Sequence, residues 1–228
     1  EELRYVATAS YYDGVRAATG FLVEDQGLEK LCSMYIPSDF GEEIHEATVD
    51  EAEARGVEYT AETTHRPDES DFTGALARLR EAGCELVTLA LTIRPTITVV
   101  ATAKQKVPGG VTDGLYAGAG WQDLESRIDN PEVAEWAEVM TERTGEFPGT
   151  GALLGQSAAL GLVNALKAAG PDLTLESFTA GMESLDYDDA IAGNRMQMGP
   201  GGHAGSEDIY ISQIQNGAWV TVDSVESD

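Results

Sequence analysis

Positive charge is scarce in this chain. Its 228 residues include 40 acidic and only 14 basic side chains, which gives a formal net charge of −26. Nucleic-acid binding and adsorption to anionic membranes both depend on clustered Lys and Arg, so the composition argues against both kinds of partner. The acidic residues are dispersed along the chain. This pattern indicates a solvated surface, either adapted to a saline medium or that of an ordinary acidic secreted protein.

Cysteine and long apolar runs are also scarce. Cys32 and Cys84 are the only cysteines, so a disulfide scaffold and a metal site built from cysteine alone are excluded. Both lie at the starts of strands that we predict to be neighbours, which leaves a bond and two buried thiols as open alternatives. No apolar run approaches the roughly 20 residues of a membrane span. No signal peptide is visible, and Glu1 reads as the start of a mature or truncated chain.

Residues 28–94 alternate between strand and helix. The sequence predicts strands over 31–36, 57–61 and 84–91, with helices over 42–55 and after 70–71. Such alternation requires right-handed crossovers and a parallel sheet. Ligands bind at the carboxyl ends of the strands in sheets of this kind. We therefore expect the functional site near residues 38–40 and 92–94.

The remaining segments are predicted to be mainly helical. Before and after the alternating region we expect a strand over 5–9, a helix over 96–104, a break at 107–110 and a strand over 114–118. Three helices should follow within 130–185, with no strand within 120–195. The chain should end in a hairpin that turns at 216–217. The helix at 152–169 is apolar around most of its circumference and needs cover on more than one side. Either the three helices form a small bundle, or, as we favour, their sheet comes from residues absent from this chain.

Several local patterns together resemble the type I periplasmic substrate-binding proteins of ABC transporters, in the group that handles leucine, isoleucine, valine and related compounds. The patterns are YIPSDFG at 35–41, DFTGALARLREAG at 71–83, GLY at 114–116, NPEV at 130–133, and MGPGGHAGS at 198–206 followed by IYI at 209–211. They occur in the family's order along nearly the whole chain. The resemblance implies an α/β fold of two lobes, each with a parallel sheet flanked by helices.

Two parts of the family pattern are missing. Members carry further residues at the amino end that build the sheet of the first lobe, which leaves one lobe incomplete here. They also have a fourth strand and a loop where Lys104 runs almost directly into Val107, so either this protein lacks that loop or further residues belong between these two positions. The resemblance then implies three parts: residues 14–113 with 199–228 as ligand-binding lobe 2, residues 1–13 as a hinge crossing, and residues 114–198 as the helical part of lobe 1.

The resemblance places the ligand contacts of lobe 2 on a small set of residues. They are Phe40, Thr92 and the hinge turn Ser10, Tyr11 and Tyr12. Aromatic rings offer contact area and hydroxyls fix orientation, which is the usual division of roles in a small-molecule pocket.

Arg94 follows Thr92 closely and is suited to two-pronged pairing with a carboxylate. The alternatives are structural: loop or hinge packing for the aromatic residues, a capping hydroxyl for Thr92 and a surface cation for Arg94. The missing loop would supply the acidic partner of a ligand ammonium group in amino-acid binders. Ser157 also stands where many members have Tyr, so the resemblance leaves amino-acid specificity open.

Catalytic and cofactor motifs are absent from the sequence. The three histidines, His45, His65 and His203, lie far apart without partners at metal-ligand spacing, and we expect His45 to be solvated. No nucleophile elbow or phosphate loop is present. We therefore expect a non-enzymatic protein without cofactor or metal.

The function that the resemblance implies is that of an extracytoplasmic solute-binding component of an ABC importer. It would be periplasmic or extracellular, would bind a small amino acid or carboxylate-bearing molecule between two lobes, and would deliver it to a transporter permease without membrane insertion. The alternative is a ligand-sensing regulatory or receptor domain of the same fold.

Overall fold

The chain forms two compact units. The structure is a computed structural model that describes residues 4–104 and 114–226, so the predicted break at 107–110 lies outside it. Unit 1 comprises residues 1–10, 119–212 and 219–228, and unit 2 comprises residues 11–118 and 213–218. Most of the segment 199–228 therefore groups with the helices of unit 1. The lobe boundaries and the hinge assignment made from the sequence stay predictions.

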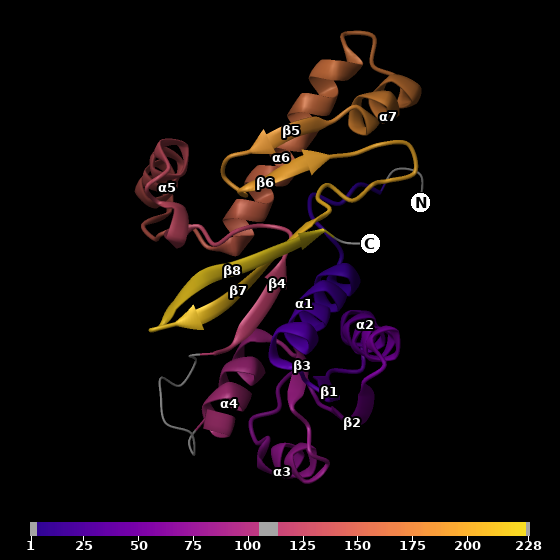
Figure 1. The fold of residues 1–228 in the computed structure, drawn as a ribbon. Coiled ribbons are helices and arrows are strands. Elements are labelled where there is room, and N and C mark those ends of the chain that lie inside the picture. The colour runs from indigo at the N-terminus through magenta and orange to yellow at the C-terminus, as the bar shows by residue number, and fades with distance from the viewer. Residues whose placement is uncertain (1–3, 105–113, 227–228) are drawn as a thin grey trace. The chain divides into compact units, whose positions relative to one another are not determined.

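Unit 2 has the predicted alternation of strands and helices (Figure 1). Its elements are α1 (Tyr11–Gln26), β1 (Lys30–Tyr35), α2 (Asp39–Arg55), β2 (Glu58–Thr64), α3 (Thr73–Glu81), β3 (Leu86–Ala90) and α4 (Ile93–Lys104). The strands pair in the order β2–β1–β3, and both pairings are parallel. The expectation of a parallel α/β sheet flanked by helices is confirmed.

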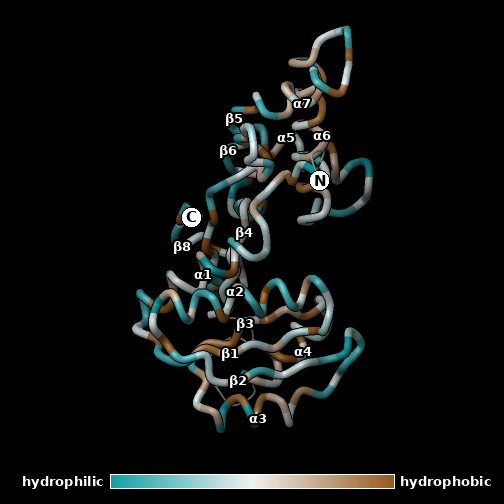
Figure 2. Tube along the Cα trace, turned by 90° about the vertical axis from the view of Figure 1, so that its right-hand side faces the viewer, coloured by the Kyte–Doolittle hydropathy of each residue, from teal (hydrophilic) through white to brown (hydrophobic). Residues whose placement is uncertain are grey.

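Strand β1 is buried on both faces because helices cover both sides of the sheet. Leu31 and Tyr35 point to one face, where they pack in clusters with residues of α1 and α2. Cys32, Met34 and Ile36 point to the other face and pack with residues of α3 and α4. The hydropathy colouring of Figure 2 shows the apolar course of β1 at the centre of this unit. Two-sided cover explains why the strand reads as a continuous apolar run.

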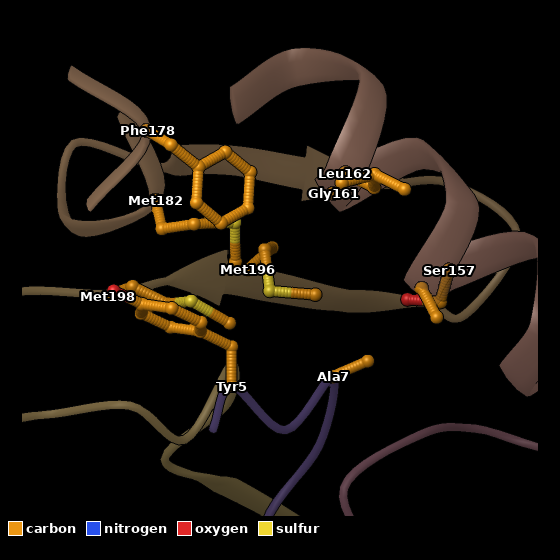
Figure 3. Close-up of a pocket in the computed structure, with 10 residues that line it drawn as sticks. Tyr5, Ala7, Ser157, Gly161, Leu162, Phe178, Met182, Met196 and Met198 are labelled. Carbon is orange, nitrogen blue, oxygen red and sulfur yellow. The ribbon is translucent and has the colours of Figure 1, made fainter. Parts of the chain in front are cut away.

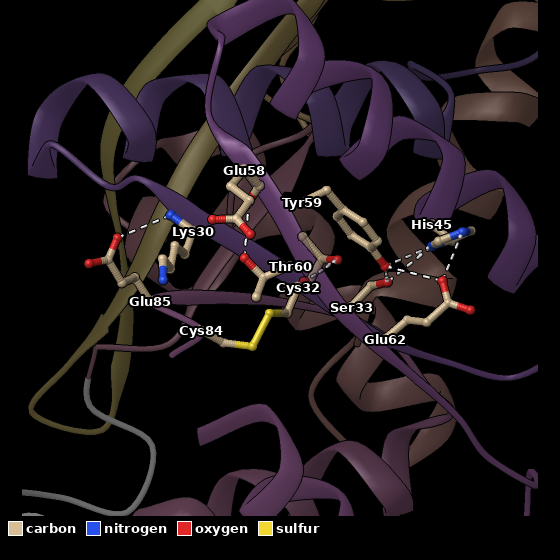
Figure 4. Close-up of a disulfide and its surroundings, with 11 residues drawn as sticks. Lys30, Cys32, Ser33, His45, Glu58, Tyr59, Thr60, Glu62, Cys84 and Glu85 are labelled. Carbon is tan, nitrogen blue, oxygen red and sulfur yellow. Dashed lines mark hydrogen bonds and ion pairs between the residues drawn. A yellow bond between two sulfur atoms is a disulfide. The ribbon is translucent and has the colours of Figure 1, made fainter. Parts of the chain in front are cut away.

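A disulfide joins the central strand to the segment before its neighbour (Figure 4). Cys32 lies on β1 and Cys84 precedes β3, with their Cα atoms 5.9 Å apart. The alternative of two free thiols, which the sequence left open, is thereby removed. The bond closes a chain segment with a sequence separation of 52 residues, and it lies within the sheet core, where Cys32 has no exposed surface.

Helix α2 begins very close to the end of β1. Ser38 is its N-cap, and the Ser38 hydroxyl accepts a hydrogen bond from the Gly41 amide at 3.3 Å. A Cβ atom at position 41 would overlap the backbone carbonyl of Ile36. Glycine is therefore required here for close approach rather than for an unusual dihedral angle. This contact fixes where the first turn of α2, including Phe40, stands at the edge of the sheet.

Unit 1 contains helices and a short antiparallel ladder. Its elements are the 3₁₀ turn η1 (Glu125–Arg127), α5 (Pro131–Thr144), α6 (Thr150–Ala169), α7 (Leu175–Glu183), β5 (Asp186–Asp189) and β6 (Asn194–Gln197), the last two paired with each other. The three helices were predicted, but the expectation of no strand within 120–195 is wrong. The carboxylate of Asp189 accepts hydrogen bonds from the amides of Ile191 and Ala192 and so shapes the turn between β5 and β6.

The strand predicted over 5–9 is also not formed as such. Only Val6 makes a bridge, in parallel with Ala204. A third set of strands pairs in the order β4 (Tyr116–Ala119), β7 (Asp208–Gln215) and β8 (Ala218–Glu226). The predicted hairpin turn joins the last two: Asn216 and Gly217 have φ values of 55° and 83°, the positive values that a type I′ turn requires.

Removal of the disulfide is expected to destabilise unit 2. A crosslink closing a loop of this length contributes about 4 kcal/mol through the entropy of the unfolded chain. The measurement is the urea midpoint of oxidised wild type, reduced wild type and Cys32→Ala/Cys84→Ala. The reduced protein serves as control for the packing lost with the sulfur atoms. Equal midpoints for the oxidised and reduced wild type would contradict the expectation.

Gly41→Ala is expected to lower stability, because the new methyl group overlaps a backbone oxygen that cannot move away independently. Overpacking of this kind costs about 1–3 kcal/mol. Gly74→Ala is the matched control: Gly74 also lies in a first helical turn, in α3, and a Cβ there meets no atom within 4 Å. Thermal unfolding should show a lower midpoint for Gly41→Ala and an unchanged or higher one for Gly74→Ala.

Candidate ligand-binding site

The carboxyl ends of two adjacent parallel strands meet at one edge of the unit 2 sheet. Tyr35 of β1 stands beside Ala90 of β3 in the parallel register, so both strands end at the same level. Helix α2 begins at Asp39 after the first strand, and α4 begins at Ile93 after the second. The first turns of both helices therefore stand at this edge. The site predicted from the sequence falls here.

Tyr11 and Phe40 form an aromatic pair at this edge. Their rings meet edge to face with centroids 5.0 Å apart and an interplanar angle of 78°. Phe40 is half-buried and packs against a cluster that contains Tyr35 and Ala90 at the strand ends. Tyr11 is 57% exposed. The pair thus joins a half-buried ring to a solvent-facing ring, and it offers apolar contact area at this edge.

Thr92 and Arg94 flank the start of α4, and both are exposed. The Thr92 hydroxyl donates to the carbonyl of Pro67 at 3.2 Å, so it braces a neighbouring loop rather than capping the helix. Within residues 4–104 and 114–226, no carboxylate forms an ion pair with Arg94. A cation in the first turn opposes the helix dipole, so its position does not stabilise α4. The same position adds to the positive potential that attracts an anion.

Tyr12 forms its hydrogen bonds with helix α2. Its hydroxyl donates to a carboxylate oxygen of Asp50 at 2.5 Å, and its amide donates to Glu43 at 3.1 Å, both on α2. The hydrogen bond to Asp50 raises the pKa of the Tyr12 hydroxyl. Ser10 belongs to unit 1. Of the six predicted contacts, Phe40, Tyr11, Thr92 and Arg94 thus lie around the sheet edge, and their ligand contacts stay predictions.

One polar cluster was missed by the sequence analysis (Figure 4). His45 stacks on Tyr35 with ring centroids 4.6 Å apart, and its Nδ1 lies 3.1 Å from both the Ser33 and the Tyr59 hydroxyl oxygens. Its Nε2 lies 3.3 Å from Glu62. The expectation of a solvated His45 is therefore wrong. Ser33 and Tyr35 are alternate residues of β1, whereas Tyr59 and Glu62 of β2 join them across an irregularity in the pairing of the two strands, a placement that the sequence alone does not reveal.

This cluster is structural in character. His45 contacts both Ser33 and Glu62, and these three residue types also make up catalytic triads. Ser33 is only 1% exposed, however, and cannot meet a substrate. Burial raises the pKa of the Tyr59 hydroxyl to about 12, so it stays protonated and available as a donor at neutral pH. In the described part of the chain, no three His, Cys, Asp or Glu side chains are arranged to hold a metal ion.

Solved structures share the fold of this chain. A leucine-binding protein from Thermotoga maritima superposes with a TM-score of 0.79 and 13% identity, covering 99% of this chain and 69% of that one. A fatty acid ABC transporter substrate-binding protein from Thermomonospora curvata gives 0.84 and 19%, covering 100% and 66%. A branched-chain amino acid ABC transporter protein from Thermus thermophilus with bound valine gives 0.81 and 19%, covering 98% and 66%.

The chain spans about two thirds of the length of these relatives, and it has their type I periplasmic-binding-protein fold over that part. No curated protein matches the sequence. The family model described as periplasmic binding protein matches residues 4–106 and 105–218. Members of this family bind solutes for transport and are not enzymes. These matches cover most of the sequence and show that the chain belongs to the periplasmic binding protein family.

Proposed function

We propose that this protein is the solute-binding component of an ABC importer and that it binds a small amino acid or another carboxylate-bearing molecule. The ligand is held between two lobes, one of them built on unit 2, and the lobes close around it by hinge motion. Arg94 pairs with the carboxylate, Thr92 orients it, and Phe40 and Tyr11 contact its apolar part. Ser10 and Tyr12 belong to the hinge turn.

The observation that carries this proposal is that the solvent-facing Arg94 and the Tyr11–Phe40 pair follow the carboxyl ends of two adjacent parallel strands, at the same edge of the sheet. An arginine offers a planar fork of donors that matches a carboxylate, and the start of α4 adds to its potential. An aromatic pair beside such a fork suits a molecule with one charged and one apolar end. Leucine, valine, benzoate and fatty acids are named with solved relatives, and every one of them carries a carboxylate.

An exported location and a permease partner are part of the same proposal. The family implies a periplasmic location. The Cys32–Cys84 disulfide is typical of oxidising compartments outside the cytosol. Among the described residues, no helix combines the length and apolarity needed to cross a bilayer.

Arg94→Ala is expected to weaken binding of the best carboxylate ligand by roughly 10- to 100-fold, because a hydrogen bond to a charged group contributes about 1.5–3 kcal/mol. A thermal-shift screen of amino acids, aromatic acids and short dicarboxylates on the complete protein identifies that ligand, and calorimetry then gives its affinity. Arg143→Ala removes the same charge from the exposed end of α5 and serves as control. Equal affinities for wild type and Arg94→Ala, or a response only to neutral sugars or amides, would contradict the proposal that the ligand carries a carboxylate.

Tyr11→Ala is expected to weaken binding without a large loss of stability, since Tyr11 is mostly exposed and contributes contact area. Tyr12→Phe keeps the ring and removes only the hydroxyl, which is already hydrogen-bonded to Asp50. Its affinity should therefore stay close to that of wild type, while its thermal midpoint falls. The reverse order of the two affinities would show that Tyr12 rather than Tyr11 contacts the ligand.

A further inference from the structure

His65 is a buried titratable residue at the carboxyl end of β2, which ends at Thr64. Its side chain is only 5% exposed. Its backbone amide donates to the carbonyl of Tyr35 at 2.8 Å, so it lies at the same edge of the sheet as the carboxyl end of β1. No role in the candidate site has so far been given to it. A buried polar ring needs partners, and these show what the residue holds in place.

Both nitrogen atoms of the His65 ring have hydrogen-bond partners. Nδ1 lies 3.0 Å from a carboxylate oxygen of Glu69, and Nε2 lies 2.7 Å from the hydroxyl oxygen of Thr63. This hydrogen bond with His65 lowers the pKa of the Glu69 carboxyl, which is therefore ionised at neutral pH. A carboxylate only accepts, so Nδ1 carries the hydrogen, and Nε2 of the neutral ring accepts from Thr63.

These partners distinguish His65 from other buried polar side chains. The hydroxyls of Tyr5 and Ser157, beside a cavity of about 250 Å³ in unit 1, have no hydrogen-bond partner among the described residues (Figure 3). The ring of His65 also packs on Phe72, a core residue of unit 2, with ring centroids 5.0 Å apart. Its orientation is therefore fixed by polar and apolar contacts together.

Glu69 joins this fixed ring to the loop that follows β2. Its second carboxylate oxygen accepts a hydrogen bond from the Arg66 amide at 3.2 Å, and its own amide donates to the Arg66 carbonyl at 3.1 Å. Pro67 lies between these bonded positions, and its ring fixes its φ angle. Its carbonyl accepts the hydrogen bond from the Thr92 hydroxyl at 3.2 Å. A continuous set of contacts thus connects the buried histidine to a side chain of the candidate site.

We propose that His65 is a positioning residue for Thr92: together with Glu69 it holds the loop after β2, and the loop holds the Thr92 hydroxyl in one orientation. This inference rests on the proposed function, in which Thr92 orients the ligand. His65 itself does not touch the ligand. A side chain that is already held in its bound orientation loses less conformational freedom on binding, which favours affinity.

The orientation of Thr92 is measured without any ligand. Three-bond couplings of its methyl carbon give χ1 by NMR of the complete protein with methyl-labelled threonine. We expect one rotamer in wild type and averaged couplings in Glu69→Ala. Asp68→Ala is the matched control, since it removes the same charge from an exposed position of the same loop. Unchanged couplings in Glu69→Ala, or equal averaging in both variants, would overturn the proposal.

Two substitutions at position 65 separate the two ring bonds. The amide nitrogen of Asn is bonded to Cγ, as Nδ1 is, so His65→Asn keeps a donor for Glu69. That of Gln lies one atom further, as Nε2 does, so His65→Gln keeps a polar group for Thr63 only. Both variants lose the ring contact with Phe72 and should lose similar thermal stability. Averaged Thr92 couplings are expected in His65→Gln alone, and the opposite order would overturn the proposal.

Affinity shows whether the held orientation serves binding. The probe is whichever of L-leucine, L-valine and benzoate, all named with solved relatives, gives the largest thermal shift. Glu69→Ala should weaken its binding roughly three- to tenfold in wild type and cause no further loss in Thr92→Val. An equal loss in both backgrounds would overturn the proposal. Wild-type affinity of Thr92→Val would contradict the proposed function of Thr92, while averaged couplings in Glu69→Ala would still support its positioning by His65.

Discussion

Strand β1 must be apolar on both faces because helices cover both sides of the sheet, and most of unit 2 follows from this constraint. Alternate side chains of the strand enter two different clusters, one with α1 and α2 and one with α3 and α4. Helical crossovers between parallel strands return the chain to the same starting edge each time. The loops that leave the strands therefore gather at the opposite edge. Gly41 packs closely against Ile36, so no flexible linker separates β1 from α2, and Phe40 is held at that edge.

The positive charge of Arg94 matters because basic residues are scarce in this acidic protein. Several of the scarce arginines are committed: Arg16 and Arg55 pair with Glu51, Arg195 pairs with Asp186, and Arg127 donates to the carbonyls of Ala190 and Ile191. An anionic ligand approaching a surface with 40 acidic residues meets net repulsion at long range. Screening limits that repulsion to about 8 Å at physiological ionic strength, whereas a cation in direct contact is hardly screened. Long-range repulsion by the acidic surface is therefore compatible with the carboxylate ligand proposed for Arg94.

Local signals in the sequence predicted the elements that depend on neighbouring residues. The Asn216–Gly217 turn is one example, since Asn tolerates a positive φ and Gly, which lacks a Cβ atom, adopts it readily. The disulfide could not be predicted, because the distance between Cys32 and Cys84 depends on the register of two strands far apart in the chain.

The placement of His45 escaped prediction for a similar reason. Its stacking partner Tyr35 comes from another element, and an acidic helix sequence gives no sign of it. The β5–β6 ladder was missed because its four-residue strands are polar and its turn depends on one buried aspartate. At the candidate site, residue positions followed from the strand ends. The engagement of Tyr12 with α2 required the packing of two helices.

Helices α2 and α6 differ in the polarity of their exposed faces. Helix α2 packs on the sheet of unit 2 with one side, and its sequence DFGEEIHEATVDEAEAR carries many acidic residues on the other. Water solvates that charged outer face readily. Helix α6 has no such face: its sequence TGALLGQSAALGLVNALKAA is apolar in nearly every direction. Two helices of one protein, under the same selection for a highly charged surface, differ in this way only if they face different surroundings. The described residues therefore leave part of the apolar surface of α6 exposed.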